Sequence, residues 1–438
     1  GINRKEKPGR RAAHGDSDND LDDHGDGSDA GMGIDAADSD LEMSASDGGL
    51  DTDEELEQRE TAAEKRLRLA KQYIERLRTE TVAGDGEVDA ADLDRDIIAD
   101  RLREDALETI GKLYRKVVDQ LALPVDESDI RSFRGHQLSV TCVAASPNGQ
   151  YLYSGAKDGS IVKWDMLAHR KVKVFPAGRK GTQRFPGHTD QVMALAVSSD
   201  DKYMASGGRD RVIHIWSVAD DKLLTTFRHH KDGITGLAFR KGANQLYSAS
   251  SDRAVKVWNI DQLSYVETLF GHQDVITGID TLSKEQCITV GGRDRTLRLW
   301  KIPEETQLVF RGGGTGVKKS DDTVAAEDVP VEGSIDCVAL LNEEHSVTGG
   351  DSGLLALWHI GRKRPLHTQP AAHGIDEESG CCRPRWITAV AALPYTDLFA
   401  SGSWDGSVKL WKLADDKRSF SLHTAIAMPG FVNALQFI

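Results

Sequence analysis

The segment HHKDGITGLAFRKGANQLYSASSDRAVKVW, residues 229–258, contains the pattern that decides the fold. Within it, His230 precedes Asp252 by 22 residues, and Asp252 precedes Trp258 by six. The same spacings recur three more times, at His136, Asp158 and Trp164, at His188, Asp210 and Trp216, and at His272, Asp294 and Trp300. Four copies of one fixed spacing indicate an internally repeated structural unit.

Two more tryptophans close units of the same kind, with departures from the pattern. Trp411 keeps an aspartate six residues before it, at Asp405, whereas Ser352 takes that position before Trp358. In five of the six units a hydroxyl-bearing residue lies four positions before this turn residue, at Ser154, Ser206, Ser248, Thr348 and Ser401. Val290 is the exception, in the fourth unit.

We interpret the repeated polar residues as a hydrogen-bond relay inside each unit. The aspartate can accept from the histidine ring, a Ser or Thr hydroxyl can fix the histidine, and the indole N–H can reach the same hydroxyl. Because a set repeated at a fixed spacing is typical of a structural device, we predict no catalytic residue and no enzyme activity. Since Val290 lacks a hydroxyl, we expect the fourth relay to retain only His272 and Asp294.

These units resemble the WD-repeat family, whose repeats close with Trp and begin near Gly-His, as at Gly135-His136 and Gly271-His272. The resemblance implies an all-β propeller. Seven similar segments, each typical of an innermost strand, begin at Val140, Val192, Ile234, Ile276, Ile335, Ile387 and Val432. We therefore predict a seven-bladed propeller over residues 131–438, with an incomplete last blade. An open ring would expose strand edges, so we expect the native protein to continue past Ile438.

The N-terminal part has a different composition. Residues 1–60 contain 19 acidic and 6 basic residues and few apolar ones, which predicts a disordered acidic tail with a basic start over residues 1–58. Apolar residues at helical spacing predict two amphipathic helices within residues 59–130, the second extending from Leu93 to Val117. These helices are expected to pack on the propeller or on a partner.

Lysines and arginines are the candidate RNA-binding residues. A stretch between the first two units, expected to be a loop, contains cations and no acid: Arg170, Lys171, Lys173, Arg179, Lys180 and Arg184. Arg209 and Arg211 flank a turn aspartate, and Lys163 interrupts an apolar column, where it either faces a ligand or packs its stem. Together these cations could bind phosphate, although scattered surface cations are commonly just solvated.

Other kinds of site lack sequence support. The five cysteines show no Cys-x-x-Cys spacing, so neither a disulfide framework nor a metal site is predicted, and no motif indicates a cofactor. The glycine-rich start of the 312–332 segment lacks the Gly-Lys-Ser/Thr ending of a nucleotide-binding loop, which favours a flexible insertion. No stretch approaches the roughly 18 consecutive apolar residues of a membrane helix, so no membrane association is expected.

Several strings outside the general repeat are more specific. They are ETAAEKRLRLAK at 60–71, SYVETLFGHQD at 264–274, GGRDRTLRLWKIPEE at 291–305 and GSIDC at 333–337. With them the chain resembles, from about residue 60 to its end, the WD-repeat proteins of the U3 small nucleolar ribonucleoprotein (U3 snoRNP). The 312–332 insertion, Ser352 and the missing end are departures from that family.

The resemblance implies a role in a nucleolar particle. The implied partners are the box B/C region of the U3 small nucleolar RNA, the small kink-turn-binding protein, and other box C/D snoRNP and small-subunit processome proteins. The implied function is non-catalytic scaffolding in pre-ribosomal RNA processing in the nucleus and nucleolus. The alternative is a protein-only scaffold such as a ubiquitin-ligase substrate receptor, although Trp164-Asp165-Met166-Leu167 lacks the Trp-Asp-x-Arg ending of one such class.

Overall fold

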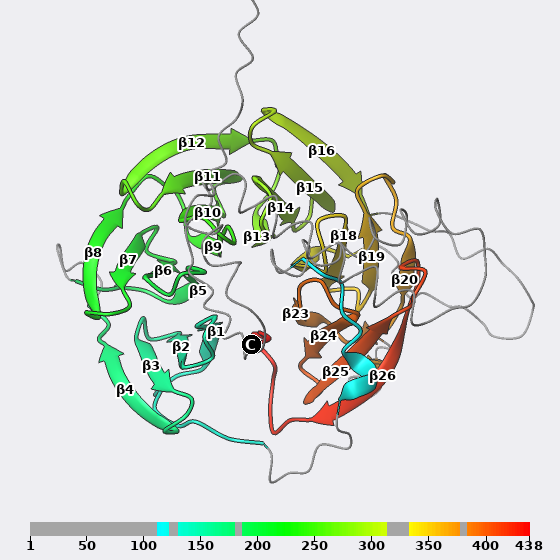
Figure 1. The fold of residues 1–438 in the computed structure, drawn as a ribbon, viewed down its shortest axis with the longest axis horizontal. Helices are drawn as coiled ribbons and strands as arrows, with labels where there is room; N and C mark the ends of the chain where they lie inside the picture. The colour runs from blue at the N-terminus through cyan, green and yellow to red at the C-terminus, as the bar shows by residue number, and fades with distance from the viewer. Residues whose placement is uncertain (1–111, 122–129, 180–185, 313–332, 377–382) are drawn as a thin grey trace, which may run out of the picture. The chain divides into compact units, whose positions relative to one another are not determined.

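The fold is a ring of antiparallel β-sheets (Figure 1). The structure, a computed structural model, describes residues 112–121, 130–179, 186–312, 333–376 and 383–438. In these segments six four-stranded sheets follow one another along the chain, and in each sheet the strands lie in sequence order from the centre of the ring to its rim. The prediction of an all-β WD-repeat propeller is confirmed.

The first three blades are built as follows. Blade one consists of β1 (Val140–Ala145), β2 (Tyr151–Ala156), β3 (Ile161–Asp165) and β4 (Arg170–Phe175). Blade two consists of β5 (Val192–Val197), β6 (Tyr203–Gly208), β7 (Ile213–Ser217) and β8 (Lys222–Phe227). Blade three consists of β9 (Ile234–Phe239), β10 (Gln245–Ser250), β11 (Ala254–Asn259) and β12 (Ser264–Phe270).

The next three blades repeat the arrangement. Blade four consists of β13 (Ile276–Asp280), β14 (Gln286–Gly291), β15 (Thr296–Lys301) and β16 (Thr306–Arg311). Blade five consists of β17 (Ile335–Leu340), β18 (His345–Gly350), β19 (Leu355–His359) and β20 (His367–Gln369). Blade six consists of β23 (Ile387–Ala392), β24 (Leu398–Ser403), β25 (Ser407–Leu413) and β26 (Phe420–Ala427), and a short hairpin of β21 (Ile375–Asp376) and β22 (Arg383–Pro384) precedes it.

The seventh inner segment lies where the repeated column predicts it, between blades six and one. Residues 428–438 form no strand, and Figure 1 places the C-terminus near the centre of the ring. Val432 packs on Gly402 of blade six as Ile234 packs on Gly207 of blade two. On the other side, the Asn433 amide donates to the carbonyl of Val140 in β1 at 2.8 Å. The segment therefore contacts both neighbouring blades.

The hydrogen-bond relay is present, and blade three shows it in full. Nδ1 of His230 lies 2.9 Å from the Asp252 carboxylate, and Nε2 lies 2.8 Å from the Ser248 hydroxyl. The Trp258 indole N–H donates to the same hydroxyl at 2.9 Å. Blade two repeats the arrangement with His188, Ser206, Asp210 and Trp216. These buried polar groups fix each hairpin to the loop that precedes its blade.

Blade one contains a variant of the relay. His136 Nε2 and the Trp164 indole N–H each lie 2.7 Å from the Ser154 hydroxyl, as expected. His136 Nδ1 does not reach Asp158 directly: it lies 3.3 Å from the hydroxyl of Ser160, which donates to Asp158 at 2.7 Å. One serine thus extends the chain of hydrogen bonds.

In blade four the prediction that His272 pairs with Asp294 alone is wrong. The Thr289 hydroxyl lies 2.8 Å from His272 Nε2 and accepts from the Trp300 indole N–H at 2.8 Å. The reason is the register of the second and third strands. The loop between their last paired residues spans 291–296 in blade four, and it is one residue longer than the corresponding loop of blade three, 250–254. Because alternate residues of a strand face opposite sides, this slip turns Thr289 toward the relay and Val290 into the apolar core.

We expect Thr289→Val to lower the free energy of unfolding by about 2 kcal/mol, because it leaves two buried N–H or ring-nitrogen groups without a partner. Chemical denaturation of the purified chain measures the loss. Val290→Thr, which places a hydroxyl in the core, is the matched control and should not stabilise the protein. A neutral Thr289→Val together with a stabilising Val290→Thr would show that the unshifted register is the true one.

Blade six also has a full relay, which the spacing rule missed. His373 lies 2.9 Å from Asp405 and 2.8 Å from the Ser401 hydroxyl, but it precedes Asp405 by 32 residues rather than 22. The insertion that includes β21 and β22 accounts for the difference. In blade five, the Trp358 indole N–H donates to Thr348 at 2.8 Å, and Ser352 replaces the turn aspartate.

The relay aspartates make stability depend on pH. Burial alone would raise the pKa of Asp252, but hydrogen bonds from His230 and from the backbone N–H groups of Lys231 and Ala254 outweigh it and lower the pKa to about 2. A carboxylate with a lowered folded-state pKa stabilises the fold above about pH 4, and this contribution is lost as the pH falls toward 2.

For Asp252→Asn we therefore expect a loss of about 2 kcal/mol in the free energy of unfolding at pH 7. The difference from the unsubstituted chain should shrink as the pH is lowered from 4 to 2, because the unfolded-state carboxyl is then protonated and the folded-state carboxyl begins to take up its proton. Urea unfolding over this pH series tests the expectation. A difference that does not change with pH would contradict the assigned ionisation.

The segment before the propeller is extended where it is described. The predicted disordered tail, the first predicted helix and most of the second lie outside the described residues. Residues 112–117, expected to end the second helix, are not helical, and a single 3-10 turn, η1 (Val118–Gln120), follows. The reason is that blade six takes the backbone donors a helix needs: Arg115 N–H donates to Tyr395, and the N–H groups of Val117 and Val118 donate to Asp397.

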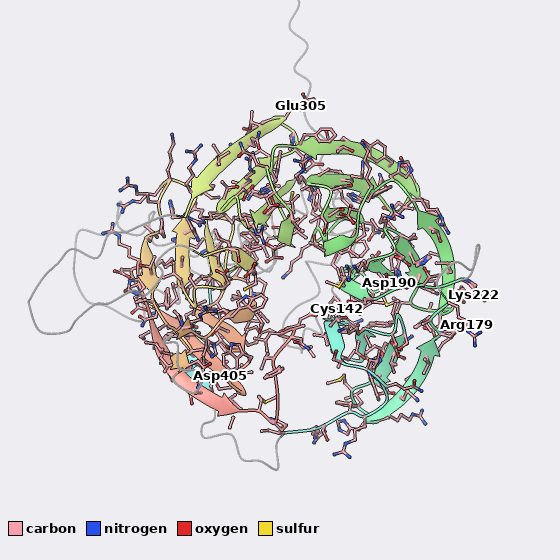
Figure 2. The ribbon with its side chains drawn as sticks, turned by 180° about the vertical axis from the view of Figure 1, so that it is seen from behind. Cys142, Arg179, Asp190, Lys222, Glu305 and Asp405 are labelled. Carbon is pink, nitrogen blue, oxygen red and sulfur yellow. The ribbon has the colours of Figure 1, made fainter. Side chains whose placement is uncertain are left out.

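Two other expectations concern the cysteines and the membrane. Cys142 is buried in β1, at the inner side of the ring in Figure 2, and burial raises the pKa of its thiol to about 12. Cys142, Cys287 and Cys337 are free thiols, so none of these three forms a disulfide.

Across the segments that the structure describes, no helix has the length and hydrophobicity needed to span a membrane.

Candidate nucleic-acid interface

The basic stretch expected as a loop at 170–184 begins as a strand. Arg170–Phe175 forms β4, the outermost strand of blade one, which pairs with β3 along its length. Its residues are exposed except for Lys173, which is half-buried, and Phe175, which is buried, as suits the outermost strand of a sheet. Arg179 follows at the rim of the ring (Figure 2). Lys180 and Arg184 lie outside the described residues.

Two lysines of the candidate set are held by intramolecular contacts. Lys163 has only 4% of its surface exposed, and its ammonium group lies 2.8 Å from the Asp221 carboxylate and 2.9 Å from the Val218 carbonyl. The ring centroid of Tyr151 lies 4.3 Å from the same nitrogen. The prediction that Lys163 contacts RNA is therefore wrong; it joins blade one to blade two. Lys173 donates to the Asp221 carbonyl at 2.9 Å.

Four exposed cations gather at the rim of blade one, and we call them the rim patch: Arg131, Arg134, Arg170 and Lys171. The Arg131 guanidinium contacts the exposed His169 ring. The side chain of Lys171 lies against Gly135, next to Arg134. Neither residues 131–139 nor residues 166–179 contain a carboxylate. The rim patch is thus a local concentration of positive charge.

Aromatic rings lie within the rim patch. The Phe133 ring centroid is 5.4 Å from that of Trp164 and 6.1 Å from that of His169. Cations beside accessible rings are typical of surfaces that bind single-stranded nucleic acid, because phosphates pair with the cations and bases stack on the rings. Sequence reasoning missed Arg131 and Arg134, although the string Arg-Ser-Phe-Arg directly before Gly135-His136 was available as a signal.

The turn cations Arg209 and Arg211 are exposed, as a binding role requires, but their surroundings are of mixed charge. They flank Asp210, and Arg211 donates to the carbonyl of Lys231 at 3.3 Å. The exposed Asp232 lies in the same loop as Lys231. Carboxylates among the cations lower the positive potential, so this surface is less favourable for phosphate than the rim patch.

A cleft of about 670 Å³ among blades four, five and six is also of mixed charge. It is lined by Arg293, Arg295, Gly333, Ser334, Asp336, Asp351 and Trp386. Trp386 is 46% exposed and offers a ring to a ligand. Two carboxylates offset the two guanidinium groups, which again makes the rim patch the stronger candidate for an RNA backbone.

Comparison with known proteins places these features in a family. A family model described as "WD domain, G-beta repeat" matches residues 127–165, 179–217, 221–259, 263–301 and 379–412. Blade five lies outside these matches, although it folds as a complete four-stranded sheet. The loss of Gly-His and of the turn aspartate therefore weakens the sequence signature without removing the blade.

The similar proteins carry names that refer to the U3 small nucleolar RNA or to ribosomal RNA processing. The chain is 49% identical over 379 residues to "U3 small nucleolar RNA-interacting protein 2" of Homo sapiens, covering 86% of this chain and 75% of the relative. It is 34% identical over 479 residues to "Ribosomal RNA-processing protein 9" of Saccharomyces cerevisiae, covering 88% and 83%.

Solved structures agree. The chain is similar, with a TM-score of 0.65 and 48% identity, to "Structure of U3-55K", over 71% of this chain and 89% of that one. It is also similar to "Crystal structure of RRP9 WD40 repeats", with a TM-score of 0.64 and 48% identity, over 71% and 87%. The chain belongs to the family of WD-repeat proteins associated with the U3 small nucleolar ribonucleoprotein.

Proposed function

We propose that this chain is a non-catalytic RNA–protein scaffold of the U3 snoRNP. In this role it binds the box B/C region of the U3 small nucleolar RNA together with the small kink-turn-binding protein, and it acts in pre-ribosomal RNA processing and small-subunit assembly. The names of the relatives support the RNA and the process. The same proposal implies nuclear and nucleolar localisation and contact with other box C/D snoRNP and small-subunit processome proteins.

The observation that supports RNA binding most directly is the rim patch. Its four cations are exposed and lie next to Phe133 and His169, and residues 131–139 and 166–179, which contain them, include no carboxylate. Each phosphate neutralised by such a cation releases condensed counterions, which makes binding favourable and strongly dependent on salt. Nearby rings supply the stacking that unpaired bases need.

The relays support a scaffold rather than an enzyme. In blade three, both ring nitrogens of His230 are engaged, and the Ser248 hydroxyl is fully buried beneath Trp258. A nucleophile must be able to approach a substrate, and this serine cannot. The equivalent sets in blades two, four and six have the same geometry.

RNA binding is tested with the full chain, a fluorescent box B/C RNA and the kink-turn-binding protein. We expect binding to box B/C RNA to be tighter than to a shuffled RNA of the same length, and tighter still when the kink-turn-binding protein is present. Affinity should fall steeply as salt is raised. Equal affinity for both RNAs, or no binding to either, would contradict the proposal and favour a protein-only scaffold.

A further inference from the structure

We propose that His188, Asp210 and His214 of blade two form a binding site for a divalent transition-metal cation of the zinc type. One nitrogen or oxygen from each residue lies within 4.8 Å of those of the other two. Imidazole nitrogen and carboxylate oxygen are the donors that zinc prefers in catalytic-type sites with three protein ligands. Cysteine spacing could not indicate this site, because none of its three ligands is a cysteine.

His214 distinguishes blade two from the others. It lies two residues before the closing tryptophan, where the other five sheets of the described chain have Val162, Lys256, Arg298, Ala356 and Lys409. This position faces the relay: the ring centroid of His214 lies 4.5 Å from that of His188. Every full relay contains a His–Asp pair, and in blade two His214 adds a third possible ligand to it.

One ring nitrogen of His214 is buried without a partner. The residue is only 2% exposed, and its Nδ1 lies 2.9 Å from the Thr226 hydroxyl, whereas its Nε2 makes no hydrogen bond. The Gly187 carbonyl lies near the ring without accepting a hydrogen bond from it. Leaving a buried polar atom unpaired is costly, and a metal bound at Nε2 would satisfy it.

Among the four blades in which the histidine reaches the turn aspartate directly, blade two has the longest distance between the two side chains. His188 Nδ1 is 3.1 Å from the nearer oxygen of Asp210, compared with 2.9 Å for His230 and Asp252, 2.8 Å for His272 and Asp294, and 2.9 Å for His373 and Asp405. A metal between nitrogen and oxygen needs such a pair to be further apart than a hydrogen bond allows, because each ligand bond is about 2.0–2.2 Å long.

The partner of the other ring nitrogen of His214 also suits metal binding. With Nδ1–H donating to Thr226, the lone pair is on Nε2, and the threonine acts as the outer partner that orients a metal-bound histidine.

His188 can release its Nδ1 without a net loss of protons. Nδ1–H donates to Asp210 in the metal-free relay, and Nε2 accepts from the Ser206 hydroxyl. When a metal takes Nδ1, the ring proton moves to Nε2 and is donated to the Ser206 oxygen, which still accepts from the Trp216 indole. The Ser206 hydroxyl keeps its own proton and rotates it away from the ring. The two histidines and Asp210 supply three ligands, and water completes the tetrahedral set.

The test uses the full chain, stripped with a chelator and titrated with Co²⁺, whose visible absorption reports tetrahedral nitrogen and oxygen ligands. The parent and all variants carry His345→Ala, because Glu344, His345 and His359 form a second possible cluster that would also bind Co²⁺. We expect one equivalent of Co²⁺, displaced by Zn²⁺. His214→Val, which installs the residue type of Val162 in blade one, should weaken binding by at least about 100-fold, and Thr226→Val by about 10-fold.

Blade three supplies the matched controls. Lys256→Val, at the same position as His214, should leave Co²⁺ binding unchanged. Lys256→His should create a second equivalent, because Lys256 faces Thr268 as His214 faces Thr226, at 2.7 Å and 2.9 Å. Equal Co²⁺ binding by the parent and by a folded His214→Val variant, or no binding by the stripped parent, would overturn the proposal. Should His214→Val not fold, failure of Lys256→His to add a site would do the same.

Discussion

Replacing all four cations of the rim patch, Arg131, Arg134, Arg170 and Lys171, by alanine is expected to weaken binding to U3 box B/C RNA by about 100-fold near 0.1 M salt. The side chains are exposed, and the carboxylate of Asp165, the cross-strand neighbour of Arg170, accepts from the backbone N–H groups of Leu167 and Ala168. The rim patch therefore keeps an excess of positive charge for phosphates. The slope of log affinity against log salt concentration should become shallower by about three, because each lost phosphate contact removes slightly less than one released counterion.

Fluorescence titrations at several salt concentrations measure both quantities. The matched control is Arg209→Ala/Arg211→Ala/Arg253→Ala, which removes exposed turn cations from a surface of mixed charge and should change affinity less than 10-fold. The four positions are on the surface, so all variants should unfold at the temperature of the parent. A larger loss of affinity in the turn variant than in the rim variant would contradict the account, because it would place the RNA on the turn cations and not on the rim patch.

Lys163→Met is expected to lower the free energy of unfolding by about 3 kcal/mol, the largest stability effect we predict for a single substitution. Methionine keeps the shape of the lysine stem, but it leaves the Asp221 carboxylate without its cation and the Val218 carbonyl without a donor. The side chains of Lys163 and Asp221 are only 5% and 18% exposed, so water cannot fully replace the ion pair.

A double variant separates the charge effect from packing. Asp221 has a positive φ of 52°, a conformation that asparagine also tolerates. Lys163→Met/Asp221→Asn removes both charges and should recover most of the lost stability in chemical denaturation. RNA affinity of the folded single variant should match that of the parent. Normal stability with impaired RNA binding would mean that Lys163 serves the ligand after all.

The sequence predicted the fold because the features that build it are repeated. The His–Asp and Asp–Trp spacings identified the blades, and seven inner segments gave the number of positions around the ring. A fixed spacing fails where the chain length between partners changes. His373 was missed because ten extra residues separate it from Asp405, and Thr289 was missed because one extra loop residue shifts the register of β14.

The candidate site was harder to predict because exposure depends on three-dimensional partners. Lys163 was an obvious anomaly in an apolar column, yet nothing in the sequence shows that Asp221, 58 residues away, neutralises it. The rim patch joins β4 to residues 131–134, and only the folded blade brings these segments together. Sequence spacing thus identified the cations of β4 but not the arginines beside them.

Photocrosslinking of the assembled particle, followed by mapping of the RNA-bound peptides of this chain, tests the central claim most directly. We predict crosslinks in peptides that contain Phe133 and His169, the rings within the rim patch. Crosslinks confined to the turns around Arg209, Arg253 and Arg293, with none on the rim of blade one, would contradict the account.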